Sequence, residues 1–138
     1  MNIKLFKGGV APAYKTAGAV CADCYARLEN KLVIKSGERY LIPLGFAIEL
    51  PIGYEAVLRP RSGLTAKGID IGIGTIDWDY RGEIKACIIN NSKEDFIIEN
   101  GDRISQIRIQ KAKQFSFTVS DNLSSTMRGV AGFGSTGV

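Results

Sequence analysis

The chain contains 138 residues, of which 45% are hydrophobic and 23% are charged, and these proportions are typical of one folded domain rather than a disordered segment. Eighteen basic and fourteen acidic residues give a net charge of +4. The basic residues are scattered along the chain, so direct nucleic-acid binding is not expected. Histidine is absent, which excludes Ser-His-Asp triads and His-ligated zinc. We therefore expect any general base to be a carboxylate, with Lys, Tyr or Cys as weaker alternatives.

No apolar run approaches the roughly 18 residues that a membrane-spanning helix needs, and the N-terminus shows no signal-peptide pattern. We therefore expect a cytoplasmic, intracellular protein with no membrane segment. Cys21 and Cys24 have the spacing of a zinc knuckle or a redox pair, but Cys87 is the only further cysteine and could not complete a closed zinc site. Free thiols in a reducing compartment are the preferred interpretation.

Short β-rich runs, separated by turn-forming residues, recur at intervals of roughly 8–12 residues, which is typical of a β-sandwich or β-barrel. The best helical candidate is a turn or two over Ser62–Lys67, with Ser62 as its N-cap. In the last β-rich run, Phe115, Phe117 and Val119 alternate with polar residues and share one face. The expected strands span residues 32–34, 40–50, 55–58, 69–73, 84–89, 96–98, 103–109 and 114–119.

The last eleven residues, RGVAGFGSTGV, contain four glycines and do not continue the β pattern. They fit two interpretations, a frayed terminus or a segment that closes over a ligand. Gly132, Gly134 and Gly137 have the GxGxxG spacing, but only Val138 follows, so the strand–turn–helix of a dinucleotide-binding fold is excluded. Glycine-rich backbone can nevertheless turn its N–H groups toward phosphate oxygens.

Two internal stretches could bind an anionic ligand or carry chemistry. Arg61-Ser62-Gly63 follows an expected strand and opens the expected helical turn, so it is either an anion site or a capped turn with a solvated arginine. Residues 72–82 alternate glycines with β-branched residues, as in a hairpin whose backbone meets a flat ligand. Asp77 and Asp79 could supply a base and a salt-bridge partner, or form a solvated acidic turn.

Five separated motifs occur along the chain. They are AGAVCADCYA at 17–26, PRSGLTAKGI at 60–69, GTIDWDYRGEI at 74–84, GDRISQI at 101–107 and RGVAGFGSTG at 128–137. In order and spacing, over the chain from Ala13 to its last residue, they resemble the trimeric deoxyuridine triphosphate nucleotidohydrolases (dUTPases). The resemblance implies an all-β fold, with a distorted jelly-roll β-barrel over residues 1–127 and a flexible glycine-rich C-terminal arm over residues 128–138.

The resemblance also implies hydrolysis of dUTP to dUMP and pyrophosphate with Mg²⁺, which limits uracil incorporation into DNA and supplies dUMP for dTMP synthesis. The enzyme would be a homotrimer with shared active sites, where the arm of one chain closes over a site formed largely by others. Two alternatives stay open on the same scaffold, a dCTP deaminase-related activity and a nucleotide-gated regulatory protein.

Individual roles follow from the same resemblance. Asp77 would hold and activate the water that attacks the α-phosphorus, and Tyr80 would stack under the deoxyribose and exclude a ribose 2′-hydroxyl. Asp23 would lie near the metal and contact it through water, and Phe133 would lie over uracil. The uracil edge would be read by the backbone of Gly72, Gly74, Thr75, Ile76 and Lys85. The phosphates would be held by Arg61, Ser62, Gly63 and Gln106, and the terminal ones also by Arg128, Gly134, Ser135 and Thr136.

Overall fold

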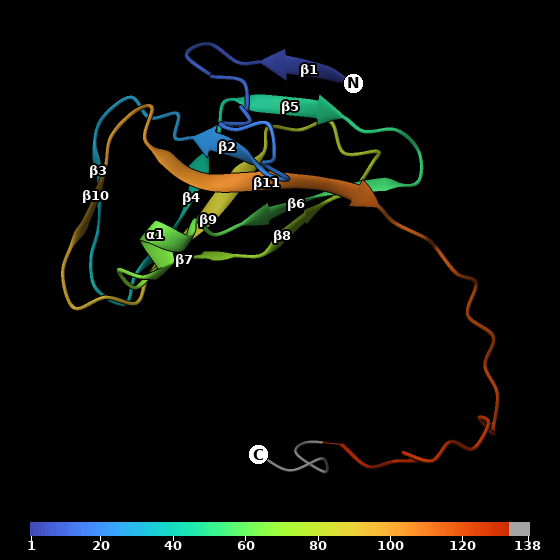
Figure 1. The fold of residues 1–138 in the computed structure, drawn as a ribbon. Helices are drawn as coiled ribbons and strands as arrows, with labels where there is room; N and C mark the ends of the chain where they lie inside the picture. Colours follow the sequence, from blue (N-terminus) through green and yellow to red (C-terminus); the bar gives the residue numbers. More distant parts are fainter. Residues whose placement is uncertain (133–138) are drawn as a thin grey trace.

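The computed structural model describes residues 1–132, and this part of the chain folds almost entirely as β-structure (Figure 1). This confirms the all-β prediction. The helix among these residues has four residues, and no helix found there is long and apolar enough to cross a membrane. The elements are β1 (Asn2–Leu5), β2 (Ala22–Tyr25), β3 (Leu32–Ile34), β4 (Arg39–Pro43), β5 (Phe46–Glu49), β6 (Tyr54–Arg59), α1 (Ser62–Thr65), β7 (Ile69–Gly72), β8 (Gly74–Ile76), β9 (Lys85–Asn90), β10 (Phe96–Ile98) and β11 (Arg103–Lys111).

The strands form four small antiparallel sheets. The largest has the order β2-β11-β6-β8, with the long strand β11 between β2 and β6 (Figure 1). A three-stranded sheet has the order β4-β9-β7, and two-stranded sheets pair β1 with β5 and β10 with β3. Neighbouring strands are often distant in sequence, so the chain crosses between sheets instead of forming a simple meander.

The core lies between the sheets and consists mainly of aliphatic side chains. In β9, Ala86, Ile88 and Asn90 point inward and alternate with less buried residues, as expected for a strand with one face in the core. The buried Asn90 side chain donates hydrogen bonds to the carbonyls of Ile34 and Glu94, so its polar amide does not destabilise the core. Each fully buried Ile, Leu or Phe contributes about 1.5–3 kcal/mol relative to an exposed position. The largest fully buried apolar side chains are Phe46, Ile34, Ile42, Leu44, Leu58, Ile88, Ile98 and Ile104.

Two local expectations for residues up to β11 were wrong. The single expected strand over residues 40–50 is divided into β4 and β5, because the intervening Gly45 has φ +76°, which an extended strand cannot accommodate. Ser62 is not an N-cap. It is the first residue of α1, and Arg61 takes the N-cap position without a side-chain hydrogen bond. The short helix is therefore positioned by the strands around it rather than by a capping side chain.

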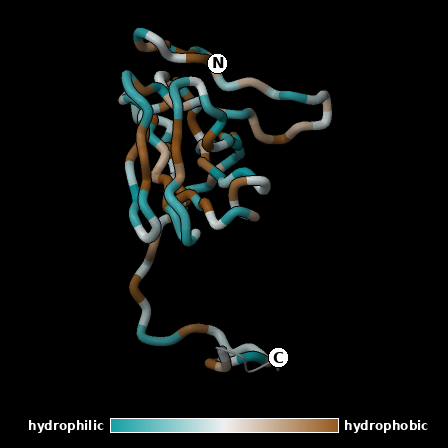
Figure 2. The backbone as a smooth tube through the Cα atoms, turned by 90° about the vertical axis from the view of Figure 1, so that its left-hand side faces the viewer, coloured by the Kyte–Doolittle hydropathy of each residue, from teal (hydrophilic) through white to brown (hydrophobic). Residues whose placement is uncertain are grey.

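The segment after β11 departs from the expected pattern. A strand was expected over residues 114–119, but the structure shows no strand within residues 112–132, and this segment extends away from the barrel (Figure 1). Phe115, Phe117 and Val119 are 73%, 98% and 98% exposed. Figure 2 shows hydrophobic stretches along this segment outside the folded body. The alternation that favours a strand is present, but no strand found among residues 1–132 pairs with it, so the strand does not form here.

Candidate active site

A hairpin-like excursion between β8 and β9 shapes a pocket that contains several of the expected site residues. After Ile76, the last residue of β8, the chain turns so that the Tyr80 N–H donates to the Asp77 carbonyl over 3.1 Å. Ile84 then leads into β9. An open pocket of about 320 Å³ lies against this excursion and one residue of β6. Its lining residues are Leu58, Gly74, Thr75, Ile76, Asp77, Tyr80, Glu83, Ile84 and Lys85.

The turn that carries Asp77 is braced from both sides. Arg81 Nη1 donates to the carbonyls of Trp78 and Tyr80 over 2.7 and 3.1 Å. The Trp78 side chain is partly buried and packs against the hydrophobic core. Asp77 and Asp79 therefore lie on a tight turn and do not share the face of an extended strand. Of the two carboxylates, Asp77 lines the pocket.

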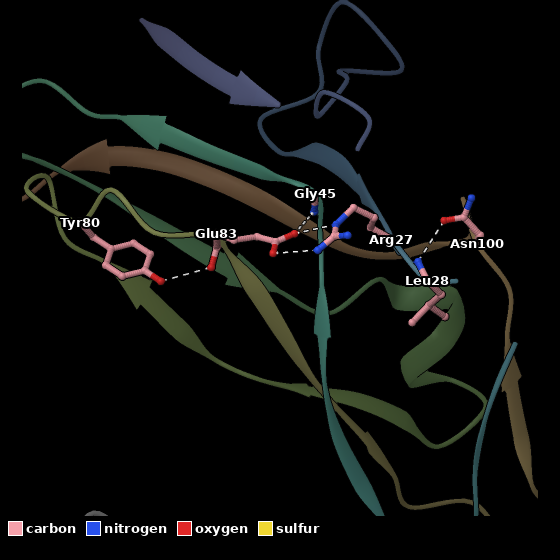
Figure 3. Close-up of polar contacts among 6 residues, drawn as sticks. All are labelled: Arg27, Leu28, Gly45, Tyr80, Glu83 and Asn100. Atoms are coloured by element: carbon pink, nitrogen blue, oxygen red, sulfur yellow. Dashed lines mark hydrogen bonds and ion pairs between the residues drawn. The ribbon is translucent and has the colours of Figure 1, made fainter. Parts of the chain in front are cut away.

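Tyr80 lies over the backbone of its own turn. Its hydroxyl donates to the Glu83 carbonyl over 3.2 Å (Figure 3). A Cβ atom at Gly82 would lie 2.5 Å from Tyr80 Cζ, so the ring occupies space that only a glycine leaves open. The residue as a whole is 47% exposed, and a flat aromatic surface is available at the pocket wall.

Glu83 also lines the pocket, and its carboxylate binds a distant part of the chain. It accepts hydrogen bonds from Arg27 Nε and Nη2 over 2.8 and 2.9 Å, and from the Gly45 N–H over 3.0 Å (Figure 3). The bidentate contact with Arg27 lowers the pKa of Glu83 from its ordinary value, more than partial burial raises it. The same contact raises the pKa of Arg27.

A second polar cluster lies where β2, β11 and the end of β6 meet. Asp23 on β2 is opposite Gln106 on β11, and its side chain is only 13% exposed. Arg103 Nη1 binds Asp23 Oδ2 at 3.0 Å, and Arg61 Nε lies 3.5 Å from Asp23 Oδ1. Arg61 also donates to the Arg103 carbonyl over 2.8 Å, and the Gln106 amide donates to the Pro60 carbonyl. Three of the sequence motifs thus contribute to one cluster.

The structure divides the residues expected at the site into groups. Gly74, Thr75, Ile76, Asp77, Tyr80 and Lys85 line the pocket, and Gly72 pairs with Cys87 in the adjoining sheet. Asp23, Arg61 and Gln106 belong to the polar cluster, beside the exposed Ser62 and Gly63 of α1. Arg128 donates to the Ala131 carbonyl within the arm. The expectations for Phe133, Gly134, Ser135 and Thr136 lie outside the described residues.

Three residues that sequence reasoning did not single out also matter here. Arg103 lies in the GDRISQI motif and Glu83 in the GTIDWDYRGEI motif, so both could have been chosen as charged members of motifs. Arg27 directly follows the first motif, and no local pattern distinguishes it from other arginines. Its partner is 56 residues away in sequence.

Asp77 and the polar cluster are displaced from each other along β6. Ile76, next to Asp77, is paired with Ala56, whereas Gln106 is paired with Arg59. Three residues of a strand span about 10 Å, and Arg61 lies further on, beyond the end of β6. Among residues 1–132, no side-chain hydrogen bond or ion pair joins the two groups.

The donor groups fit a metal ion held mainly by a ligand rather than by the protein. The described residues contain no group of three or more His, Cys, Asp or Glu side chains suited to metal binding. Mg²⁺ commonly keeps several waters and binds substrate phosphates together with one or two carboxylates, so a single carboxylate such as that of Asp23, whose oxygens face Arg61 and Arg103, would suit a contact through water. The cysteines are free, and burial raises the pKa of Cys24 to about 12, so this thiol is not a nucleophile at neutral pH.

Sequence comparison assigns the chain to a family. The model of the dUTPase family matches residues 9–137. A deoxyuridine 5′-triphosphate nucleotidohydrolase of Treponema denticola is 49% identical over 138 residues, which cover 98% of this chain and 96% of that protein. Both matches extend over nearly the full chain, so they include all five motifs rather than one of them.

Structural comparison agrees with the sequence comparison on the fold. A point mutant of the dUTPase from Staphylococcus bacteriophage 80alpha, solved with dUpNHpp, has a TM-score of 0.87 at 24% identity and covers 99% of this chain and 98% of its own. A mutant dUTPase from phage phi11 of S. aureus, described with a structural Mg(II) ion, has a TM-score of 0.80 at 20% identity, covering 88% and 96%. The predicted jelly-roll barrel is therefore confirmed, and the chain belongs to the dUTPase family of nucleotide-metabolising hydrolases.

Proposed function

We propose that this chain hydrolyses dUTP to dUMP and pyrophosphate, with Asp77 holding the water that attacks the α-phosphorus. The observation that carries the proposal is the pocket itself, because one turn places a carboxylate, an aromatic ring and exposed backbone together at its wall. A carboxylate is the expected base in a chain without histidine. Family membership supplies the substrate class.

Asp77 is exposed and lies on a braced turn, so its carboxylate can accept a proton from a bound water without a large rearrangement. Phosphoryl transfer depends mainly on positioning and charge stabilisation. In this proposal Asp77 orients the water in line with the leaving pyrophosphate and takes its proton. The attacking oxygen then remains in dUMP.

The pocket wall would select the nucleoside. Tyr80 would stack under the deoxyribose, where its ring leaves no room for a 2′-hydroxyl. The backbone of Gly72–Ile76 and of Lys85 would read the uracil edge, which presents two carbonyls on either side of an N–H. A cytosine presents a different order of donors and acceptors, and mismatched buried groups are costly. Phe133 of the arm would cover the base.

The polar cluster would hold the triphosphate. Arg61 provides a guanidinium group already oriented by Asp23, and Gln106, Ser62 and Gly63 lie on the adjoining segments. Arg128, Gly134, Ser135 and Thr136 of the arm would close on the terminal phosphates. We further propose that Mg²⁺ binds these phosphates and reaches Asp23 through water. When bound, Mg²⁺ neutralises phosphate charge and favours departure of pyrophosphate.

The displacement of Asp77 from the polar cluster supports a homotrimer with shared active sites. A phosphate chain that reaches Asp77 of one protomer would contact Arg61 and Gln106 of another. The exposed apolar side chains of Phe115, Phe117 and Val119 support the same assembly, because single chains rarely leave such side chains in water in a continuous strand-like pattern. We also propose that residues 128–138 act as an arm that closes a neighbouring site.

Product analysis tests the function. The purified chain is incubated with Mg²⁺ and dUTP, dCTP or UTP, and pyrophosphate and ammonia are measured. We expect pyrophosphate to form far faster from dUTP than from dCTP or UTP, whereas ammonia from dCTP would favour the deaminase alternative. Asp77→Asn should reduce turnover by at least about 100-fold, while Asp79→Asn, on the same turn, should retain most of it. The opposite ranking of the two variants would contradict the assignment of Asp77.

A further inference from the structure

We propose that Gly82 and the Arg27–Glu83 ion pair are positioning elements that hold the Tyr80 ring where it discriminates between deoxyribose and ribose. The proposal rests on the proposed role of Tyr80 at the sugar. It goes beyond that role because it assigns the precision of sugar selection to three residues that were given no role in binding the substrate.

The first element is the missing side chain at position 82. The Tyr80 ring packs over Gly82 so closely that a Cβ atom there would lie 2.5 Å from Cζ and 3.0 Å from Cε2. Non-bonded carbon atoms prefer separations of about 3.5–4.0 Å. Gly82 is not among the glycines with positive φ, so an alanine would not strain the backbone. The atoms that must move are at the far end of the Tyr80 side chain.

The second element is the carbonyl that receives the Tyr80 hydroxyl. This oxygen belongs to Glu83, and the next residue is tied by two backbone hydrogen bonds. The Ile84 N–H donates to Phe46 over 2.9 Å, and the Ile84 carbonyl accepts from Leu44 over 3.0 Å. The position of the hydroxyl is therefore set by the chain that joins β4 to β5.

The third element is the Glu83 side chain, whose contacts hold the residue that provides this carbonyl. Its carboxylate receives three hydrogen bonds, two from Arg27 and one from the Gly45 N–H (Figure 3). Arg27 is itself tied to this bend, since its N–H donates to the Pro43 carbonyl over 2.9 Å. Bidentate guanidinium–carboxylate pairs restrict orientation as well as distance. The network thus connects Arg27 to the Tyr80 ring through one residue.

Steric discrimination depends on this precision. A ribose 2′-hydroxyl differs from hydrogen by one oxygen atom, so a ring displaced by about 1 Å no longer excludes it, and such a displacement can cost about 100-fold in a positioned reaction. Loss of the network should therefore lower the preference for dUTP over UTP. A purely structural role for these residues would lower stability or activity on both substrates together, without changing their ratio.

The test compares kcat/KM for dUTP and UTP in the assembled, full-length protein. We expect Gly82→Ala to lower the dUTP/UTP ratio at least tenfold and Arg27→Gln at least threefold, with Arg27→Lys between Arg27→Gln and wild type. Gly18→Ala is the matched control, because a Cβ there meets nothing within 4 Å. An unchanged ratio in Gly82→Ala would overturn the proposal.

Double variants separate this proposal from the role of Tyr80. If Tyr80→Ala leaves the dUTP/UTP ratio unchanged, the sugar-contacting role itself is wrong. If Tyr80→Ala lowers the ratio and Gly82→Ala does not, the positioning proposal alone is wrong. We expect no further loss of the ratio when Gly82→Ala is added to Tyr80→Ala, because both act through one ring. Tyr80→Phe, which removes the hydroxyl that binds the Glu83 carbonyl, should lower the dUTP/UTP ratio as much as Arg27→Gln does. If Arg27→Gln does not fold, Tyr80→Phe tests the role of the network in its place.

Discussion

Arg103 donates a hydrogen bond to the Asp23 carboxylate across 3.0 Å, although the two residues lie 80 positions apart in the sequence and belong to different motifs. The β11–β2 pairing is irregular between Arg103 and Ser105, and such irregularities redirect side chains at the edges of sites. Asp23 also binds Arg61. One carboxylate therefore orients two guanidinium groups in the cluster proposed to hold the triphosphate.

Asp23→Asn should raise KM for dUTP by about tenfold and leave kcat less affected, because the amide keeps the shape but no longer fixes both arginines. The Mg²⁺ concentration for half-maximal activity should also rise. Steady-state kinetics at several Mg²⁺ concentrations measure both effects. Asp70→Asn, a half-buried carboxylate on β7 outside the cluster, serves as the control. Unaltered KM and Mg²⁺ dependence in Asp23→Asn would contradict both roles of Asp23.

Truncation after Met127 tests the arm. Residues 128–131 are exposed, so we expect the truncated chain to fold and assemble normally, as checked by circular dichroism and sedimentation. Turnover should fall by orders of magnitude, because water exclusion and in-line positioning are lost together. An active truncated enzyme would show that the segment is only a frayed end.

Mixing two inactive variants tests whether the arm serves a neighbouring chain. Trimers lacking residues 128–138 and trimers carrying Asp77→Asn should partly restore activity together once subunits exchange. Exchange itself is followed independently with labelled chains. Demonstrated exchange without restored activity would mean that each arm closes the Asp77 site of its own chain.

The exposed apolar residues of the segment after β11 offer a separate test of assembly. Phe117 is 98% exposed, so Phe117→Ser should not destabilise the barrel of a single chain. If the segment packs on a neighbouring protomer, the substitution should weaken the trimer, and the measured mass should fall at low protein concentration. A mass that is the same as wild type at every concentration would contradict packing of this segment between protomers.

The Arg27–Glu83 pair predicts a pH dependence of stability. Hydrogen bonding from Arg27 lowers the pKa of Glu83 in the folded protein, whereas an unfolded Glu titrates near about 4.3. A lowered folded pKa adds stability that is complete above the unfolded pKa and is lost as the pH falls through the folded pKa. The difference in Tm between wild type and Glu83→Gln should therefore be largest above about pH 5 and shrink below it. A difference independent of pH would contradict the ionised pair.

Local sequence patterns predicted two strands with the correct bounds. β3 (Leu32–Ile34) and β10 (Phe96–Ile98) coincide with their expected runs, because turn-forming residues flank each run. The family resemblance placed Asp77, Tyr80 and Lys85 at the site, and the structure shows that these residues line one pocket.

Contacts between distant parts of the chain could not be predicted from a single sequence. The Arg27–Glu83 pair joins residues 56 positions apart, and no local period marks such a pair. The alternation of Phe115, Phe117 and Val119 has the strand period, yet a strand forms only beside a hydrogen-bonding partner, which the described part of this chain does not provide. Sequence thus shows which segments can pair but not where their partner lies.

The fate of the attacking oxygen tests the central claim most directly. Hydrolysis of dUTP in water enriched in ¹⁸O, followed by mass spectrometry of both products, identifies the phosphorus that is attacked. Attack at the α-phosphorus by the water held at Asp77 predicts one ¹⁸O atom in dUMP and none in pyrophosphate. In Asp77→Asn the labelled product should form at least about 100-fold more slowly. Label in pyrophosphate, or wild-type rates in Asp77→Asn, would contradict the account.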